Sequence, residues 1–169
     1  MKSKVSLINI TIVGIATALI IGAQVSLSFI PNVELVTLLI ILFTLHFHKR
    51  TIYIIYIFAI VECLIYPFGL WCIVYFYIWT ILYFLVCIFK ESTSALFWAV
   101  LGAIYGLLFG TLSSIPSFFT LGFVGGISSI IAGLSFDFIH CFGNFIVILC
   151  LFKPLNNLLG KIHFFTTLS

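Results

Sequence analysis

Long apolar stretches, interrupted by short polar or helix-breaking segments, run along this chain from one end to the other. We identify six such stretches, over residues 5–30, 33–47, 51–66, 71–89, 94–112 and 121–152. Turn signals such as Pro31-Asn32 and Lys49-Arg50 separate them. Because a membrane-spanning helix needs about 20 apolar residues, the pattern predicts an all-α fold: one integral membrane domain over residues 1–169, built as a six-helix bundle.

Three of the six stretches have unusual lengths. Residues 33–47 and 51–66 are short, and at 1.5 Å per residue each covers only about 24 Å. We expect these two helices to be shielded by neighbours or to lie beside a cavity. The last stretch, 121–152, is too long for one upright helix and contains Gly125-Gly126. We predict an external loop to about Gly125 and a helix after it.

Composition supports a bilayer environment. Hydrophobic residues make up 64% of the chain and charged residues 7%, whereas a soluble domain is about one quarter charged. This excludes most soluble folds. The aromatic fraction of 18% also excludes a disordered chain.

The basic residues all fall on one side of the predicted bundle. They precede the first stretch or follow the second, fourth and sixth: Lys2, Lys4, Lys49, Arg50, Lys90, Lys153 and Lys161. By the positive-inside rule, both termini are predicted to be cytoplasmic. The net charge of +3 therefore indicates orientation in the lipid bilayer and no nucleic-acid partner.

The first stretch has an alternative interpretation. Lys2 and Lys4 before an apolar run are also typical of a secretory signal peptide, with Ala16-Thr17-Ala18 as a cleavage site. The apolar run continues to Ile30, longer than a usual signal core. Its removal would also leave five spans and break the charge pattern, so we expect it to be retained.

Motifs for nucleotide, metal and cofactor chemistry do not occur in the sequence. It has no P-loop, no His-Glu-x-x-His, no Gly-x-Ser-x-Gly and no Gly-x-Gly-x-x-Gly. The five cysteines include no Cys-x-x-Cys pair and lie in or beside apolar stretches, so we interpret them as reduced packing residues. We therefore expect no cofactor, no metal and no enzymatic activity.

Small residues recur every four positions in two of the stretches. They are Gly14, Ala18 and Gly22 in the first, and Gly102, Gly106 and Gly110 in the fifth. In lipid, helices associate closely along such small faces. Either stripe can pack the protein on itself, or one of them can dock another membrane protein, and the sequence leaves both interpretations open.

Polar side chains lie within the apolar stretches. Asp137, His140 and Asn144 are three and four residues apart and so share one helix face. Glu34 and Glu62 also lie in apolar surroundings. Such groups are costly in hydrocarbon and should face the bundle interior. They indicate ligand recognition or a proton-linked role, although Asp137 and His140 can instead form a local pair or hold a kink.

Aromatic residues form a stripe in the fourth stretch. Trp71, Tyr75, Trp79 and Tyr83 follow one another at four-residue intervals. Such a stripe can line a pocket for a flat small molecule, because rings offer stacking area with polar tips. Near the membrane surface, Trp71 alone is also typical of an interfacial belt.

Several segments together resemble the substrate-binding S components of energy-coupling factor transporters. The resemblance covers nearly the whole chain and is carried by residues 31–37 (Pro-Asn-Val-Glu-Leu-Val-Thr), Glu62, residues 66–69, the aromatic run 71–79, and residues 136–140 and 143–145.

The resemblance implies a six-helix subunit of the bacterial plasma membrane that captures a vitamin or related micronutrient from outside. It implies two kinds of partner, a membrane coupling subunit and two cytosolic ABC-type ATPases. It assigns docking to the first stripe, where the family's alanine-x-x-x-alanine pattern reads Gly14, Ala18, Gly22 here. It also supports a substrate site made of Asn32, Glu34, Glu62, Trp71, Tyr75, Trp79, Asp137, His140 and Asn144.

Two rival functions remain at this point. The first is a proton-coupled carrier or channel that works alone, with the carboxylates as its relay. The second is a small intramembrane enzyme that uses Asp137 and His140 as an acid/base pair. The second lacks another carboxylate or nucleophile at a suitable spacing.

Overall fold

Every regular element in the described part of the chain is a helix. The computed structural model describes residues 7–30 and 33–167, with side chains up to residue 161. The helices are α1 (Leu7–Leu27), α2 (Val36–Phe47), α3 (Arg50–Ile65), α4 (Leu70–Ile88), α5 (Ala95–Ser113), α6 (Ile115–Thr120) and α7 (Gly122–Thr167). The prediction of an all-α fold is confirmed for these residues. Lys2, Lys4 and Asn32 lie outside them.

Five of the predicted stretches coincide with a helix to within a few residues, and the sixth does not. The external loop expected up to about Gly125 is wrong, because this segment is helical: α6 ends at Thr120 and α7 begins at Gly122. Gly122 has a φ of 71°, a left-handed conformation that glycine adopts without steric penalty. The chain therefore reverses within a single tight turn. At its other end α7 continues beyond the predicted limit to Thr167 and includes Pro154.

The length and surface of the helices are compatible with a membrane bundle. Within the described residues, 4 helical segments are long and apolar enough to cross a membrane: Leu7–Leu27, Leu70–Ile88, Ala95–Thr120 and Gly122–Lys161. Large apolar side chains such as Leu19, Phe84 and Phe138 are exposed on the outside of the bundle. A surface of this kind is compatible with a lipid environment.

The short helix α2 lies at the centre of the bundle. It has 12 residues, most of which are buried, and it contacts α1, α3, α4, α5 and α7. The hydroxyl of Thr44 donates to the carbonyl of Ile40 at 2.7 Å, so this buried polar group is satisfied within the helix. The expectation that neighbours shield this short helix is confirmed.

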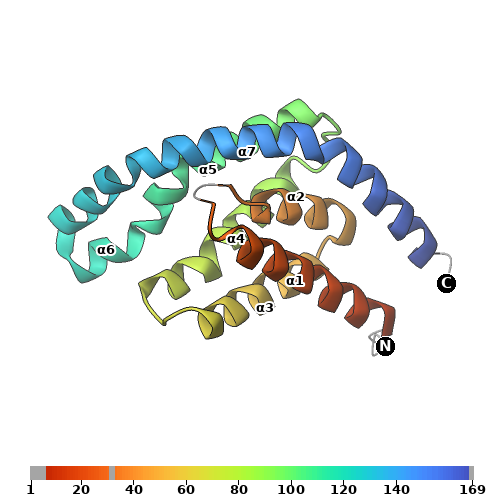
Figure 1. The fold of residues 1–169 in the computed structure, drawn as a ribbon, viewed down its shortest axis with the longest axis horizontal. Coiled ribbons are helices and arrows are strands. Elements are labelled where there is room, and N and C mark those ends of the chain that lie inside the picture. The colour runs from red at the N-terminus through yellow and green to blue at the C-terminus, as the bar shows by residue number, and fades with distance from the viewer. Residues whose placement is uncertain (1–6, 31–32, 168–169) are drawn as a thin grey trace.

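Helices α1, α2, α3, α4, α5 and α7 run in alternating directions (Figure 1). The start of α1 and the end of α7 lie at the same end of the molecule in this view. We call this end of the molecule the basic end. Lys49, Lys90 and Tyr83 line one depression there, and His46 Nε2 lies 2.9 Å from Asn156 Oδ1 of α7. The connections from α1 to α2 and from α3 to α4 lie at the opposite end, which we call the cavity end.

The two stripes of small residues have different surroundings. On α5, a methyl group at Gly106 would lie 3.0 Å from the backbone oxygen of His140 on α7, and one at Gly110 would lie 2.5 Å from Asp137 Oδ1. On α1, a methyl group at Gly14 or Gly22 would meet nothing within 4 Å. The α5 stripe therefore packs inside the bundle, and α5 and α7 run side by side (Figure 1).

Candidate functional site

A cavity of about 260 Å³ lies among the helices near the cavity end. We call it the inner cavity. Its lining comes from α1, the segment before α2, α4, α5 and α7: Gln24, Leu27, Ser28, Ile30, Val33, Glu34, Tyr75, Trp79, Phe109, Phe136 and His140. Four helices and the segment before α2 thus contribute to one chamber, and most of its lining residues are aromatic or aliphatic. Small-molecule pockets have this composition.

Three polar side chains of the inner cavity have atoms without a hydrogen-bond partner. Trp79 is 3% exposed and His140 is 4% exposed, yet the indole Nε1 and both imidazole nitrogens have no partner. Glu34 Oε1 is likewise buried without one. Native proteins pair nearly all buried polar groups. An indole donor, an imidazole and a carboxylate oxygen are therefore available to a ligand in this chamber.

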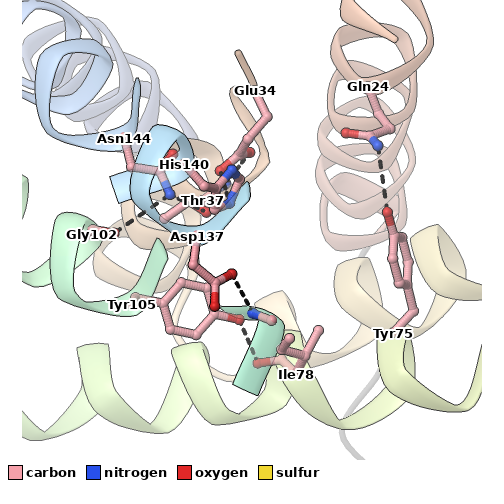
Figure 2. Close-up of polar contacts among 11 residues, drawn as sticks. Gln24, Glu34, Thr37, Tyr75, Ile78, Gly102, Tyr105, Asp137, His140 and Asn144 are labelled. Carbon is pink, nitrogen blue, oxygen red and sulfur yellow. Dashed lines mark hydrogen bonds and ion pairs between the residues drawn. The ribbon is translucent and has the colours of Figure 1, made fainter. Parts of the chain in front are cut away.

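Glu34 has a structural role as well. Its Oε2 accepts a hydrogen bond of 2.8 Å from the backbone amide of Thr37, which satisfies one of the free donors at the start of α2. The other oxygen, Oε1, is not used by this bond and lies in an ion-pair contact with His140, 3.9 Å from its Nε2 (Figure 2). The carboxylate is held in place by the helix that it caps, so its free oxygen needs little reorganisation to meet a ligand.

Aromatic rings hold His140 in position. Its imidazole stacks on Phe136 with ring centroids 5.2 Å apart and an interplanar angle of 22°. The ring of Phe109 lies at the same centroid distance of 5.2 Å at an angle of 58°. Neither contact uses a ring nitrogen, so packing orients the imidazole. Its Nε2 lies in an ion-pair contact with Glu34, and neither ring nitrogen has a hydrogen-bond partner.

A second cavity of about 410 Å³ adjoins the first, and we call it the outer cavity. It is lined by Gln24, Ser28, Glu62, Tyr66, Trp71 and Tyr75. Gln24, Ser28 and Tyr75 border both cavities. Gln24 Nε2 donates to the hydroxyl of Tyr75 at 3.4 Å (Figure 2). A polar contact between α1 and α4 thus stands where the two chambers meet.

The predicted aromatic stripe follows α4 from one end of the bundle to the other. Trp71 and Tyr75 have ring centroids 5.3 Å apart, and Tyr75 and Trp79 have centroids 5.7 Å apart; both pairs are nearly perpendicular. The first three residues of the stripe line the cavities. Tyr83 lies beyond them and lines the depression at the basic end.

Asp137 and Asn144 are buried but do not line either cavity. Asp137 Oδ1 accepts a 2.7 Å hydrogen bond from the backbone amide of Gly110. Asn144 Nδ2 lies 3.5 Å from both Thr37 Oγ1 and the carbonyl oxygen of Gly102. Figure 2 shows these contacts between α7 and its neighbours. Both side chains therefore join helices, and of the predicted polar face only His140 reaches the inner cavity.

Several lining residues were not singled out from the sequence. Gln24 is an isolated amide in an apolar stretch, and a polar residue in such a place is itself a signal that could have found it. Tyr66 lines the outer cavity together with Glu62 and Trp71, both of which were predicted as site residues. Phe109 and Phe136 carry no comparable signal, because this sequence contains 20 phenylalanines and only the fold separates wall residues from lipid-facing ones.

Metal ions are usually held by several His, Cys, Asp or Glu side chains. Within the described residues, no group of 3 or more such side chains is placed to hold one ion. The cysteines Cys63, Cys72, Cys87, Cys141 and Cys150 are free thiols. Comparison with protein-family models, curated proteins and solved structures found no match for this chain. The geometry of the two cavities is therefore the basis for any functional assignment.

Proposed function

We propose that this chain is the substrate-capture subunit of an importer of the energy-coupling factor type. It takes a small, flat ligand from the extracellular side of the bacterial plasma membrane into the inner cavity. The observation that carries the proposal is the aromatic-lined chamber in which buried polar atoms of Glu34, Trp79 and His140 have no hydrogen-bond partner.

The size of the inner cavity limits the ligand. Its volume of about 260 Å³ is just below the roughly 300–1,000 Å³ of typical small-molecule pockets. A single ring or a small fused ring system fits such a space. Tyr75, Trp79 and Phe109 offer ring surfaces for stacking, while Glu34 and His140 supply polar contacts at the edge. This combination favours a heteroaromatic ligand over an aliphatic one.

Orientation follows from the charges. Lys49, Arg50 and Lys90 belong to the basic end, and the positive-inside rule assigns that end to the cytoplasm. The cavity end then faces the cell exterior, with both termini cytoplasmic and six crossings of the membrane. In this arrangement the ligand enters from outside through the outer cavity.

The proposed partners are a membrane coupling subunit and two cytosolic ABC-type ATPases. The chain has no P-loop of its own, so in the proposed importer the ATPases supply the energy for release. The α1 stripe of Gly14, Ala18 and Gly22 is open on the outside of the bundle. Small residues allow close approach of a second helix in lipid, and we assign docking of the coupling subunit to this face.

The experiment that tests the proposal is native mass spectrometry of the purified chain in a mild detergent. We expect one small molecule retained per chain. When that molecule is added back to ligand-free protein, Trp79→Ala should weaken binding about tenfold or more, because a buried aromatic contact is lost. Phe84→Ala is the matched control, since Phe84 is an exposed aromatic residue of the same helix.

Three outcomes would contradict the proposal. Absence of any retained or rebinding small molecule would remove the capture function. Equal affinity in the wild-type and Trp79→Ala proteins would remove the inner cavity from binding. Flux of the molecule through liposomes that contain the purified chain alone would favour the stand-alone carrier or channel.

A further inference from the structure

Glu62 is the unusual residue of the outer cavity. The residue is 1% exposed, it lines the cavity, and its Oε1 has no hydrogen-bond partner. A buried carboxylate without a partner is costly, and such groups are normally paired with a cation or with hydrogen-bond donors. The missing partner has to be sought among neighbouring side chains or in a ligand.

The protein itself supplies no cation at this place. None of the described residues that line the two cavities is Lys or Arg. Along α3, the nearest basic residue is Arg50 at the start of the helix, 12 residues and about 18 Å from Glu62 at a rise of 1.5 Å per residue. Glu62, with its unpartnered oxygen, therefore lines a chamber whose described lining contains no basic side chain.

Three aromatic residues, Tyr66, Trp71 and Tyr75, line the outer cavity together with Glu62, Gln24 and Ser28. The ring of Trp71 is nearly perpendicular to that of Tyr66, at 82° with centroids 6.4 Å apart, and to that of Tyr75, also at 82°, with centroids 5.3 Å apart. Trp71 Nε1 already donates to the carbonyl of Pro67 at 2.9 Å. This bond fixes the indole, which consequently offers the cavity ring surface and no free donor.

We propose that the outer cavity binds a positively charged nitrogen group of the ligand, an ammonium or a cationic heteroaromatic ring. The faces of aromatic rings attract organic cations, and a nearby carboxylate adds the attraction of an opposite charge. This inference rests on the proposed function, because the flat remainder of the same ligand occupies the inner cavity. The Gln24–Tyr75 contact between the chambers is long, at 3.4 Å, so a ligand that spans both displaces only a weak bond.

The test uses two probes that differ only in charge: choline and its neutral carbon isostere 3,3-dimethyl-1-butanol. Each is titrated into the purified full chain in a non-ionic detergent at constant ionic strength, and tryptophan fluorescence reports binding beside Trp71. We expect choline to bind at least about tenfold more tightly than the isostere, since only choline gains the attraction of the carboxylate and the ring faces.

Variants connect this preference to the cavity. Glu62→Gln keeps the shape of the side chain and should reduce the preference for choline to less than about threefold. Tyr66→Leu should weaken choline binding several-fold and leave the isostere unaffected. Glu91→Gln is the control, because Glu91 is an exposed carboxylate beside Lys90 and should change nothing.

The inference is overturned by equal affinities for the two probes, by no saturable response to choline, or by an undiminished preference in Glu62→Gln. If the chain nevertheless retains a small molecule in a Trp79-dependent manner, only the cation site fails and the proposed function stands. If choline binds through Glu62 but no native ligand is retained, the proposed function fails and the cation site remains.

Discussion

His140 and Glu34 show how single residues combine packing with binding in this bundle. The imidazole is stacked on Phe136 and flanked by Phe109, while one oxygen of the carboxylate caps α2. Each group is oriented by contacts that leave another of its atoms free. A site preorganised in this way loses little entropy when the ligand arrives, which favours tight binding.

Asp137 provides the prediction at the residue scale. Because its Oδ1 accepts from the amide of Gly110, Asp137→Ala should lower the free energy of unfolding by about 1 kcal/mol or more. Asp137→Asn keeps an acceptor oxygen and should lose less than half as much. Unfolding of both variants in detergent measures the difference. Equal losses in the two variants would show that this hydrogen bond does not stabilise the bundle.

The sequence predicted part of the site at this scale, for a physical reason. Helical spacing showed that Asp137, His140 and Asn144 share a face, and all three are buried. Spacing gives direction around the axis, but seven residues also separate Asp137 from Asn144 by about 10 Å along it. The three side chains therefore meet different neighbours, and only the fold identifies His140 as the one in the inner cavity.

At the scale of elements, two helices with the same sequence pattern have different surroundings. The stripe on α5 packs against α7, whereas the stripe on α1 is open. Periodicity alone could not separate them, because four-residue spacing of small residues permits close packing without indicating which partner provides it. The error near Gly125 has a different cause. The glycine pair at 125 and 126 indicated a loop, but the left-handed backbone conformation that makes the turn lies at Gly122.

Leucine substitutions distinguish the two stripes. Gly106→Leu should lower the free energy of unfolding by about 1–3 kcal/mol or more, because the added side chain meets the backbone of α7. Ala18→Leu should leave unfolding and ligand binding unchanged and should prevent co-purification with the coupling subunit. Thermal unfolding and affinity purification from cells that express the whole importer measure these effects. Normal co-purification of Ala18→Leu would contradict the docking assignment.

At the scale of the whole molecule, the chain is divided into two ends of different chemistry. The basic end gathers His48, Lys49 and Lys90 around one depression. The cavity end gathers carboxylates and aromatic rings around two chambers. The proposed function therefore requires one orientation: the chambers open to the cell exterior, and the cations contact the cytoplasm.

The most direct test of this claim is thiol labelling with a membrane-impermeant reagent in intact cells. The five native cysteines are replaced, and single cysteines are introduced by Phe68→Cys and Lys90→Cys. Phe68 is 84% exposed in the connection between α3 and α4 at the cavity end, and Lys90 lies at the basic end. We expect labelling of Phe68→Cys in intact cells and of Lys90→Cys only after permeabilisation. The reverse pattern, or labelling of both in intact cells, would contradict the proposed orientation.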